Sequence, residues 1–443
     1  MISRRQLLAA MASTPVVSMM GTGSAHALPN NDYQALVCVF LFGGNDGFNM
    51  LVPNDNAHYD EYAAARPDIA ISQASLLPLS LNTGSGLTLS LHPSMIDAQG
   101  LFNSGKMVAI SNSGVLIEPS TKTGLKDGTH AMPPFLFSHN SQQTEWQRGW
   151  SGSTTTLGWA GRMMDVLSSD TDTISPTFSL NGYAQLLNGS DYSANLINAS
   201  SLPKVNAINN AQRRKSFDQV MNLSPLTAFG REFDRVKSDS ISIRDTLASA
   251  IDSIPEEGHF PDISLSHQLH TVARLIKSSD QLGHQKQVYF VGLGGFDTHA
   301  NQLNDHAELM SALSQSLAAF NQSMEAAGLS DKVTTMTMSD FGRRLASNGT
   351  GTDHGWASNH LVMGGALNSG QLYGQWPSLI LDGENDFNKG RMIPTTSVEQ
   401  IGATIAKWMG VTSDSAMDYI FPNLANFTVQ DLGFLRVKKL NVY

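Results

Sequence analysis

Short apolar runs alternate along the chain with longer segments in which apolar residues recur every three or four positions. The short runs end in glycine or polar residues and cover residues 35–42, 105–111, 287–292 and 333–338. Runs of this length predict buried strands. Helical spacing appears in residues 158–167, 267–277 and 309–320. The alternation predicts an α/β fold, in which helices flank a mainly parallel sheet.

The pattern changes between about residues 195 and 261. Asn, Ser, Gln and charged residues dominate there, strand signals are weak, and two stretches show helical spacing. We interpret this segment as a mostly helical insertion or lid on the sheet domain rather than as an independent domain. The prediction is therefore one α/β domain over residues 28–443.

The first residues have the features of an export signal. The pair Arg4-Arg5 precedes a mildly apolar stretch that ends near Met20, and residues 25–27 match the A-x-A cleavage pattern. These features predict a twin-arginine (Tat) signal peptide over residues 1–27, recognised by the Tat translocase. The mature protein would then be periplasmic or secreted. The alternative is an uncleaved N-terminal membrane anchor. No later stretch is apolar and long enough to span a bilayer.

Charge and cysteine content narrow the possible functions. The net charge is −10 and no basic patch stands out along the sequence, which argues against nucleic acid as a partner. The single cysteine, Cys38, cannot form an internal disulfide. It lies within the apolar run 35–42, which favours a buried core thiol over a nucleophile.

Candidate metal ligands follow the predicted strands. Asp46 lies among glycines after the first run, although an ordinary turn would look the same. Asp297 and His299 follow the run 287–292, and alternate residues of an extended segment point the same way. The remaining candidates lie after the run 333–338, partly on a glycine-rich loop, and are Asp340, Asp353, His354 and His360. Such ligands predict a divalent cation, Zn²⁺ or Mn²⁺ first and Ca²⁺ or Mg²⁺ as further candidates.

A candidate nucleophile precedes a predicted helix. Ser138 lies where unpaired backbone N–H groups and the helix dipole would favour an oxyanion. The alternative is that Ser138 or Asn140 only caps the helix. His139 is a candidate ligand or general acid, with a plain surface position as the alternative.

Four motifs together resemble a known superfamily. They occupy residues 41–53 (LFGGNDGFNMLVP), 137–146 (FSHNSQQTEW), 294–302 (GGFDTHANQ) and 339–365 (SDFGRRLASNGTGTDHGWASNHLVMGG). In this order they resemble the alkaline phosphatase/sulfatase superfamily and, within it, an exported bacterial family known as domain of unknown function 1501. The resemblance implies an alkaline-phosphatase-like fold.

The resemblance also implies metal ligands. Asp46 matches the first aspartate of the superfamily site, and Asp297 with His299 resembles an Asp…His metal pair. Asp340 matches the aspartate of an S-D-H-G pattern in which this chain has Phe341 instead of histidine. His354 then resembles a late histidine ligand.

Two questions stay open at this stage. A rival alignment takes Asp353-His354 as the Asp-His pair and His360 as the late histidine. Ser138 is in the region of the superfamily nucleophile, but no C-x-P-S-R sulfatase motif is present.

The sequence thus leads to two main functional hypotheses, beside a third in which the site holds a redox or oxygen-using metal. The first is an exported, metal-dependent hydrolase of phosphate or related, sulfate-type esters, acting on a small anionic ester or an envelope polymer. The second is a catalytically degenerate envelope binding or assembly protein on the same scaffold, with a co-exported protein as its partner. Phe341 and the unassigned nucleophile favour the second hypothesis.

Overall fold

A computed structural model describes residues 33–84, 86–168, 174–198, 210–221 and 227–437. The predicted signal peptide, residues 1–27, lies outside the described residues. Within the described part of the chain, no helix is both long and apolar enough to cross a membrane.

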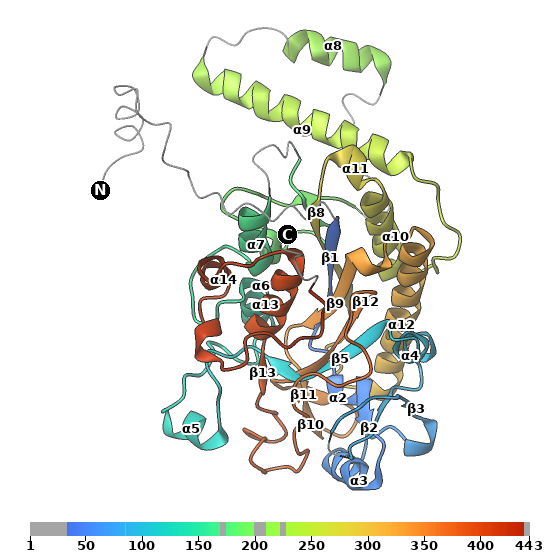
Figure 1. Cartoon of the computed structure of the whole chain (residues 1–443), viewed down its shortest axis with the longest axis vertical. Helices are drawn as coiled ribbons and strands as arrows, with labels where there is room; N and C mark the ends of the chain where they lie inside the picture. Colours follow the sequence, from blue (N-terminus) through green and yellow to red (C-terminus); the bar gives the residue numbers. More distant parts are fainter. Residues whose placement is uncertain (1–32, 85, 169–173, 199–209, 222–226, 438–443) are drawn as a thin grey trace, which may run out of the picture. The chain divides into compact units, whose positions relative to one another are not determined.

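One eight-stranded sheet organises the described domain (Figure 1). Its strands, in spatial order, are β13 (Thr396–Ser397), β5 (Met107–Gly114), β12 (Ser358–Gly364), β9 (Val333–Ser339), β1 (Gln34–Phe42), β8 (Lys286–Gly294), β6 (Thr177–Ser179) and β7 (Asn195–Leu196). Only β12 runs antiparallel to its neighbours β5 and β9. The predicted mainly parallel sheet is therefore confirmed.

Helices cover both faces of the sheet. Alternate residues of β1 therefore pack into two separate hydrophobic cores, one on each face. Val37 and Val39 pack into one core with residues of α4, α9, α10 and α12, whereas Cys38 and Phe40 pack into the other with residues of α6, α7, α13 and α14. Cys38 is fully buried, and burial raises its pKa. The thiol is a core side chain, as expected.

The helices have the following bounds: α2 (Gly47–Met50), α3 (Asn56–Ala65), α4 (Ile96–Asn103), α5 (Lys122–Asp127), α6 (His139–Arg148), α7 (Trp159–Leu167), α8 (Ala211–Met221), α9 (Ala228–Asp252), α10 (Ser264–Lys277), α11 (Ser279–Leu282), α12 (Gln302–Ala326), α13 (Val398–Met409) and α14 (Asp414–Ile420). The smaller sheets contain β2 (Leu51–Pro53), β3 (Leu77–Pro78) and β4 (Leu89–Leu91), and separately β10 (Arg343–Ser347) and β11 (Thr352–His354).

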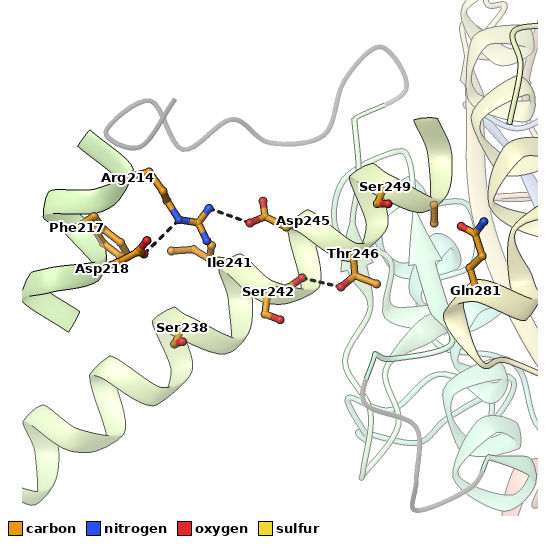
Figure 2. Close-up of a pocket in the computed structure, with 11 residues that line it drawn as sticks. Arg214, Phe217, Asp218, Ser238, Ile241, Ser242, Asp245, Thr246, Ser249 and Gln281 are labelled. Carbon is orange, nitrogen blue, oxygen red and sulfur yellow. Dashed lines mark hydrogen bonds and ion pairs between the residues drawn. The ribbon is translucent and has the colours of Figure 1, made fainter. Parts of the chain in front are cut away.

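The segment predicted as a helical insertion contains α8 and α9 among its described residues. An open groove of about 770 Å³ lies between these helices (Figure 2). Its arginine is already neutralised, since Arg214 lies 2.9 Å from Asp245 and 3.2 Å from Asp218. No histidine or cysteine lines the groove. Its chemistry is thus that of a solvated helix pair, and whether the segment acts as a lid stays a prediction.

Candidate metal centre

The centre lies where three neighbouring parallel strands end. In the register of the sheet, Phe42 of β1 is opposite Gly294 of β8, and Leu41 is opposite Ser339 of β9. The loops that follow these strands therefore begin side by side, as expected for ligand-bearing loops of an α/β sheet. Gly43 allows the close approach, because a Cβ there would lie 2.4 Å from the Asp297 nitrogen.

His139 enters the centre from the first turn of α6. Its Nδ1 lies 2.6 Å from Oδ2 of Asp340, a fully buried carboxylate that follows β9. The same oxygen accepts from Gln143 Nε2 at 3.0 Å. A carboxylate accepts only, so Nδ1 of His139 carries the hydrogen and Nε2 keeps a lone pair. That Nε2 lies 3.5 Å from Oδ2 of Asp297.

His354, on β11, is in the same tautomer as His139. Its Nδ1 lies 2.8 Å from the carbonyl oxygen of Phe137, which fixes the hydrogen on Nδ1. Its Nε2 lies 3.3 Å from Oδ1 of Asp297 and 3.1 Å from Nε2 of His299. His299 in turn points Nδ1 at Asp353, 3.4 Å away.

Asp297 is the meeting point of these side chains. Its Oδ1 lies 3.1 Å from Nε2 of His299 and 2.9 Å from Nη1 of Arg343, whose side chain is fully buried. Burial raises the pKa of Asp297, but the hydrogen bond and charge of Arg343 outweigh burial, so the net pKa is lowered. Asp297 is therefore ionised at neutral pH while it remains open to solvent on one side.

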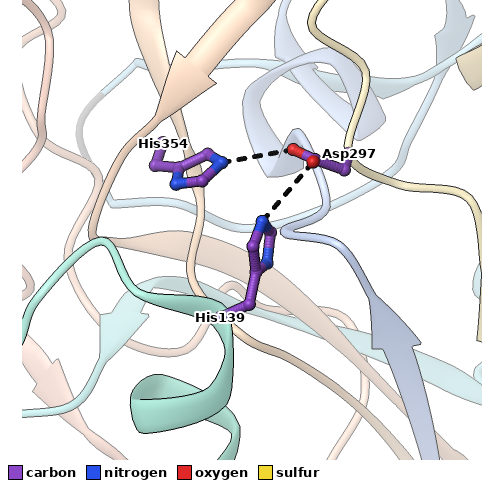
Figure 3. Close-up of side chains that lie close together, drawn as sticks. All are labelled: His139, Asp297 and His354. Atoms are coloured by element: carbon purple, nitrogen blue, oxygen red, sulfur yellow. Dashed lines mark hydrogen bonds and ion pairs between the residues drawn. The ribbon is translucent and has the colours of Figure 1, made fainter.

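This geometry fits a cation. Ligand atoms of His139, Asp297 and His354 all lie within 4.8 Å of one another (Figure 3). A tetrahedral ion with bonds near 2.1 Å places its ligands about 3.4 Å apart. The separations above run from 3.1 to 3.5 Å. Each imidazole also offers its Nδ1 to an oxygen, the arrangement that orients metal-bound histidines.

The pKa of His139 also agrees with a cation at this position. The hydrogen bond with Asp340 raises its pKa, although burial opposes this. A raised pKa means that Nε2 has a high affinity for positive charge, which a proton or a metal ion can supply.

Two residues expected as ligands, Asp46 and His360, do not join this group in the structure. Asp46 is fully buried, and Arg66 Nη1 lies 3.0 and 2.9 Å from its two oxygens. Gln302 Nε2 lies 2.5 Å from Oδ2. The carboxylate is thus fully occupied by protein donors. Burial raises its pKa, but the charges of Arg66 and His306 reverse the shift, and the pKa is lowered.

His360, on β12, is the second. Its ring is buried and lies 4.7 Å from that of Trp146, and neither of its nitrogens has a partner among the described residues. Burial lowers its pKa to about 3. It adds no ligand atom to the group at His139. Of the two late-histidine candidates, His354 lies in this group and His360 does not.

Ser138 and Phe341 lie beside the cluster. Ser138 is the N-cap residue of α6, but its side chain makes no capping hydrogen bond and is exposed. The Phe341 ring packs 4.8 Å from the ring of His139 and 4.7 Å from that of His354. Phe341 replaces the histidine of the S-D-H-G pattern, so this position supplies an apolar surface beside the imidazoles instead of a metal ligand.

The sequence interpretation missed several residues that shape the centre. They are Arg66, Gln143, Gln302, Thr352 and Arg391. Gln143, Gln302 and Thr352 lie inside the motifs at 137–146, 294–302 and 339–365, whereas Arg66 and Arg391 lie outside all four motifs. Gln143 also follows His139 by four positions and so lies on the same helix face.

Fold and site together define an α/β protein with a candidate metal centre at the carboxyl ends of its strands. Residues 33–420 match the family described as "Protein of unknown function (DUF1501)", and the chain belongs to that family. The predicted family is thereby confirmed. No curated protein matches the chain.

Several solved structures are similar in outline. Lipoteichoic acid synthase LtaP from Listeria monocytogenes aligns with 8% identity and a TM-score of 0.36, over 87% of this chain and 74% of that one. The zinc complex of the C-terminal periplasmic domain of EcEptC from Escherichia coli gives 10% and 0.35, over 93% and 91%. The PsFucS1 sulfatase from Pseudoalteromonas sp. gives 11% and 0.35, over 91% and 73%. At these TM-scores the likeness says nothing about what this chain binds or does.

Proposed function

We propose that this protein is an exported, metal-dependent hydrolase of phosphate or sulfate-type esters. The observation that carries the proposal is that ligand atoms of His139, Asp297 and His354 lie within 4.8 Å of one another, with Nε2 of both imidazoles facing the ionised Asp297 carboxylate. Nitrogen-rich sites with one carboxylate suit Zn²⁺ or Mn²⁺ better than Ca²⁺ or Mg²⁺, which prefer oxygen ligands.

The chain's own residues would hold one cation. Asp297 supplies the charge, and His139 and His354 supply imidazole nitrogens whose orientation is fixed by Asp340 and Phe137. His299, whose Nε2 lies 3.1 Å from Asp297, is placed beside them. When bound, a divalent metal polarises an ester oxygen and stabilises the charge that develops there. Arg343, a buried cation 2.9 Å from Asp297, already supplies a second positive charge at the centre. We therefore propose one metal ion per chain.

Two further residues, Ser138 and Phe341, have proposed roles in the reaction. Ser138 presents an exposed hydroxyl at the start of α6, directly before His139, and we assign it as the group that attacks the phosphorus or sulfur atom. The bond to the ester alcohol breaks, the alcohol leaves with the serine proton, and water then releases phosphate or sulfate and restores the hydroxyl. Helix N–H groups next to it favour an oxyanion. Phe341 covers one side of the imidazoles and excludes water from that side.

The test is a metal and activity assay on the full chain purified from its export route. We expect one equivalent of Zn²⁺ or Mn²⁺ and turnover of an aryl phosphate or aryl sulfate, both lost in Asp297→Ala. The control is Asp262→Ala, because the Asp262 side chain is fully exposed. If wild-type protein holds no stoichiometric metal, the proposal is wrong.

The second function, an envelope binding or assembly protein without catalysis, also has an observation in its favour. Asp46 is closed off by Arg66 and Gln302, and Phe341 offers no ligand, so the described residues build only one cation position. Stoichiometric metal with no turnover of any tested phosphate or sulfate ester would support this function over hydrolysis.

A further inference from the structure

Arg391 differs from the other arginines around the centre. Arg66, Arg343 and Arg344 each pair with a carboxylate, at 2.9, 2.9 and 2.5 Å. Arg391 uses only its Nε, which donates to the carbonyl oxygen of His354 at 3.2 Å. Among the described residues, neither of its two Nη atoms has a hydrogen-bond or ion-pair partner. The two-pronged end of this side chain is thus available to a ligand.

The backbone holds Arg391 rigidly. It lies in a tight turn in which the buried Asp386 accepts from Gly390 N at 2.8 Å, while Arg391 N donates to Asn388 O at 3.1 Å. Gly390 has a φ of 81°, and a Cβ there would lie 2.7 Å from the Leu345 nitrogen. Only glycine fits this position. Arg391 is therefore placed in advance of any ligand, which reduces the entropic cost of binding.

The side chain is also fixed against the centre itself. Its guanidinium carbon lies 4.4 Å from the centroid of the Phe137 ring. Phe137 has a φ of 75°, a left-handed conformation that is unfavourable for a phenylalanine, and its carbonyl oxygen holds Nδ1 of His354. One strained residue thus supports both a cluster histidine and the arginine beside it. Strain of this kind gathers at functional sites.

The local charges favour an anion as the missing partner. Burial and the nearby charge of Arg344 lower the pKa of Arg391, while the charges of Asp353 and Asp386 raise it. Asp353 is already paired with Arg344, and Asp386 accepts from backbone N–H groups, so neither carboxylate occupies the Nη atoms of Arg391. A planar guanidinium with two free Nη atoms matches two oxygens of a phosphate or sulfate group.

We propose that Arg391 is the specificity-determining residue of the centre and binds the non-bridging oxygens of the ester. This inference rests on the proposed function and narrows it. The substrate must carry an anionic phosphoryl or sulfuryl group, so a neutral carboxylic ester would gain nothing from Arg391.

Binding of inorganic phosphate to the full, metal-loaded chain tests the inference without turnover. Calorimetry should show at least tenfold weaker phosphate binding in Arg391→Gln and an intermediate loss in Arg391→Lys, which keeps the charge but not the fork. Arg436→Gln, an exposed arginine 4.0 Å from Asp331, should bind as wild type does. Unchanged affinity in Arg391→Gln, or no phosphate binding by wild type at millimolar concentration, would overturn the inference.

Kinetics and metal content complete the test. With aryl phosphate and aryl sulfate we expect KM to rise at least tenfold in Arg391→Gln with a smaller change in kcat, and no change with an aryl acetate. If Arg391→Gln loses the cation, Arg391 only supports His354 and the inference is wrong. Phosphate binding that depends on Arg391, without turnover of any ester, would sink the proposed function and leave the inference standing. Turnover that depends on Asp297 but not on Arg391 would do the reverse.

Discussion

Two regions of this molecule have similar local sequences, but the aspartate in each lies in a different chemical environment. We call His139, Asp297, His299, Asp340, Asp353 and His354 the rim cluster, and Asp46, Arg66, Gln302, Thr352 and Arg343 the Asp46 network. In both, an aspartate follows a buried strand beside glycines. Asp297 is partly exposed and meets imidazole lone pairs, whereas Asp46 is fully buried and meets N–H donors.

This comparison shows that the groups in contact with an aspartate decide its role more than the sequence around it does. Asp297 has one cationic protein partner, Arg343, and the imidazoles on its open side leave a position that a further cation fits. A carboxylate surrounded by donors is already satisfied and becomes part of the framework. The two regions are nevertheless joined. Gln302 Oε1 accepts from Thr352 Oγ1 at 2.6 Å, which accepts from Arg343 Nε at 2.8 Å, and Arg343 reaches Asp297. The Asp46 network therefore ends on Asp297, the carboxylate at the middle of the rim cluster.

The largest effect should follow from removing a lone pair from the rim cluster. His354→Ala should abolish stoichiometric metal binding and lower turnover by about a thousandfold, because a bound metal supplies several kcal/mol of transition-state stabilisation. Thermal stability of the metal-free protein should change little. Elemental analysis, steady-state kinetics and a melting curve measure these three quantities. A variant that keeps its metal would show that His354 is not a ligand.

A change in the Asp46 network should act on stability instead. Asp46→Asn leaves the buried Arg66 without a charge partner, which should lower the free energy of unfolding by about 3 kcal/mol. The double variant Asp46→Asn/Arg66→Met should recover most of this loss. Urea unfolding gives the free energies. The comparison breaks if Asp46→Asn loses metal while still folded, since Asp46 would then be a ligand.

Asp340 lies at the boundary of the two behaviours and should show a smaller effect. It is buried like Asp46, yet it accepts from Nδ1 of His139. Asp340→Asn should weaken metal binding by about 10- to 100-fold, because the amide no longer fixes the hydrogen on Nδ1. Titration with a chromophoric chelator measures the affinity. Equal affinity in the variant would mean that His139 is not oriented through Asp340.

Much of the framework follows from sequence alone. The runs at 35–42, 287–292 and 333–338 predict β1, β8 and β9, because strands buried on both faces are nearly continuous apolar segments. Their polar successors also predict Asp297 and Asp340 at one edge of the sheet. Both inferences depend on local pattern and on the parallel order of strands, which the sequence carries directly.

The composition of the site depends on contacts that the pattern does not carry. Arg66 contacts Asp46 from the end of α3. No residue next to Asp46 in the sequence therefore indicates that the charge of Asp46 is neutralised. His360 looked like a ligand because it follows His354 in a loop-like stretch. It lies instead on β12, and its ring is buried against Trp146. Burial and long-range pairing decided both positions.

His360 gives the smallest predicted effect and the sharpest contrast with His354. His360→Phe keeps a ring against Trp146 and removes two nitrogens that have no partner among the described residues. At pH 7.5 the variant should be more stable by about 1 kcal/mol, since burying an unsatisfied polar group is costly. Its metal content should equal that of wild type.

The contrast becomes stronger in acid. Burial lowers the pKa of His360 to about 3, below its ordinary value of 6.5, so the unfolded chain binds a proton between these values that the folded chain does not. Stability from this group is therefore present above pH 6.5 and is lost as the pH falls. Between pH 6.5 and 5, wild type should lose about 2 kcal/mol more than His360→Phe, from 1.4 kcal/mol for each unit. Parallel urea curves at the two pH values, or loss of metal from His360→Phe at pH 7.5, would show that His360 belongs with the rim histidines after all.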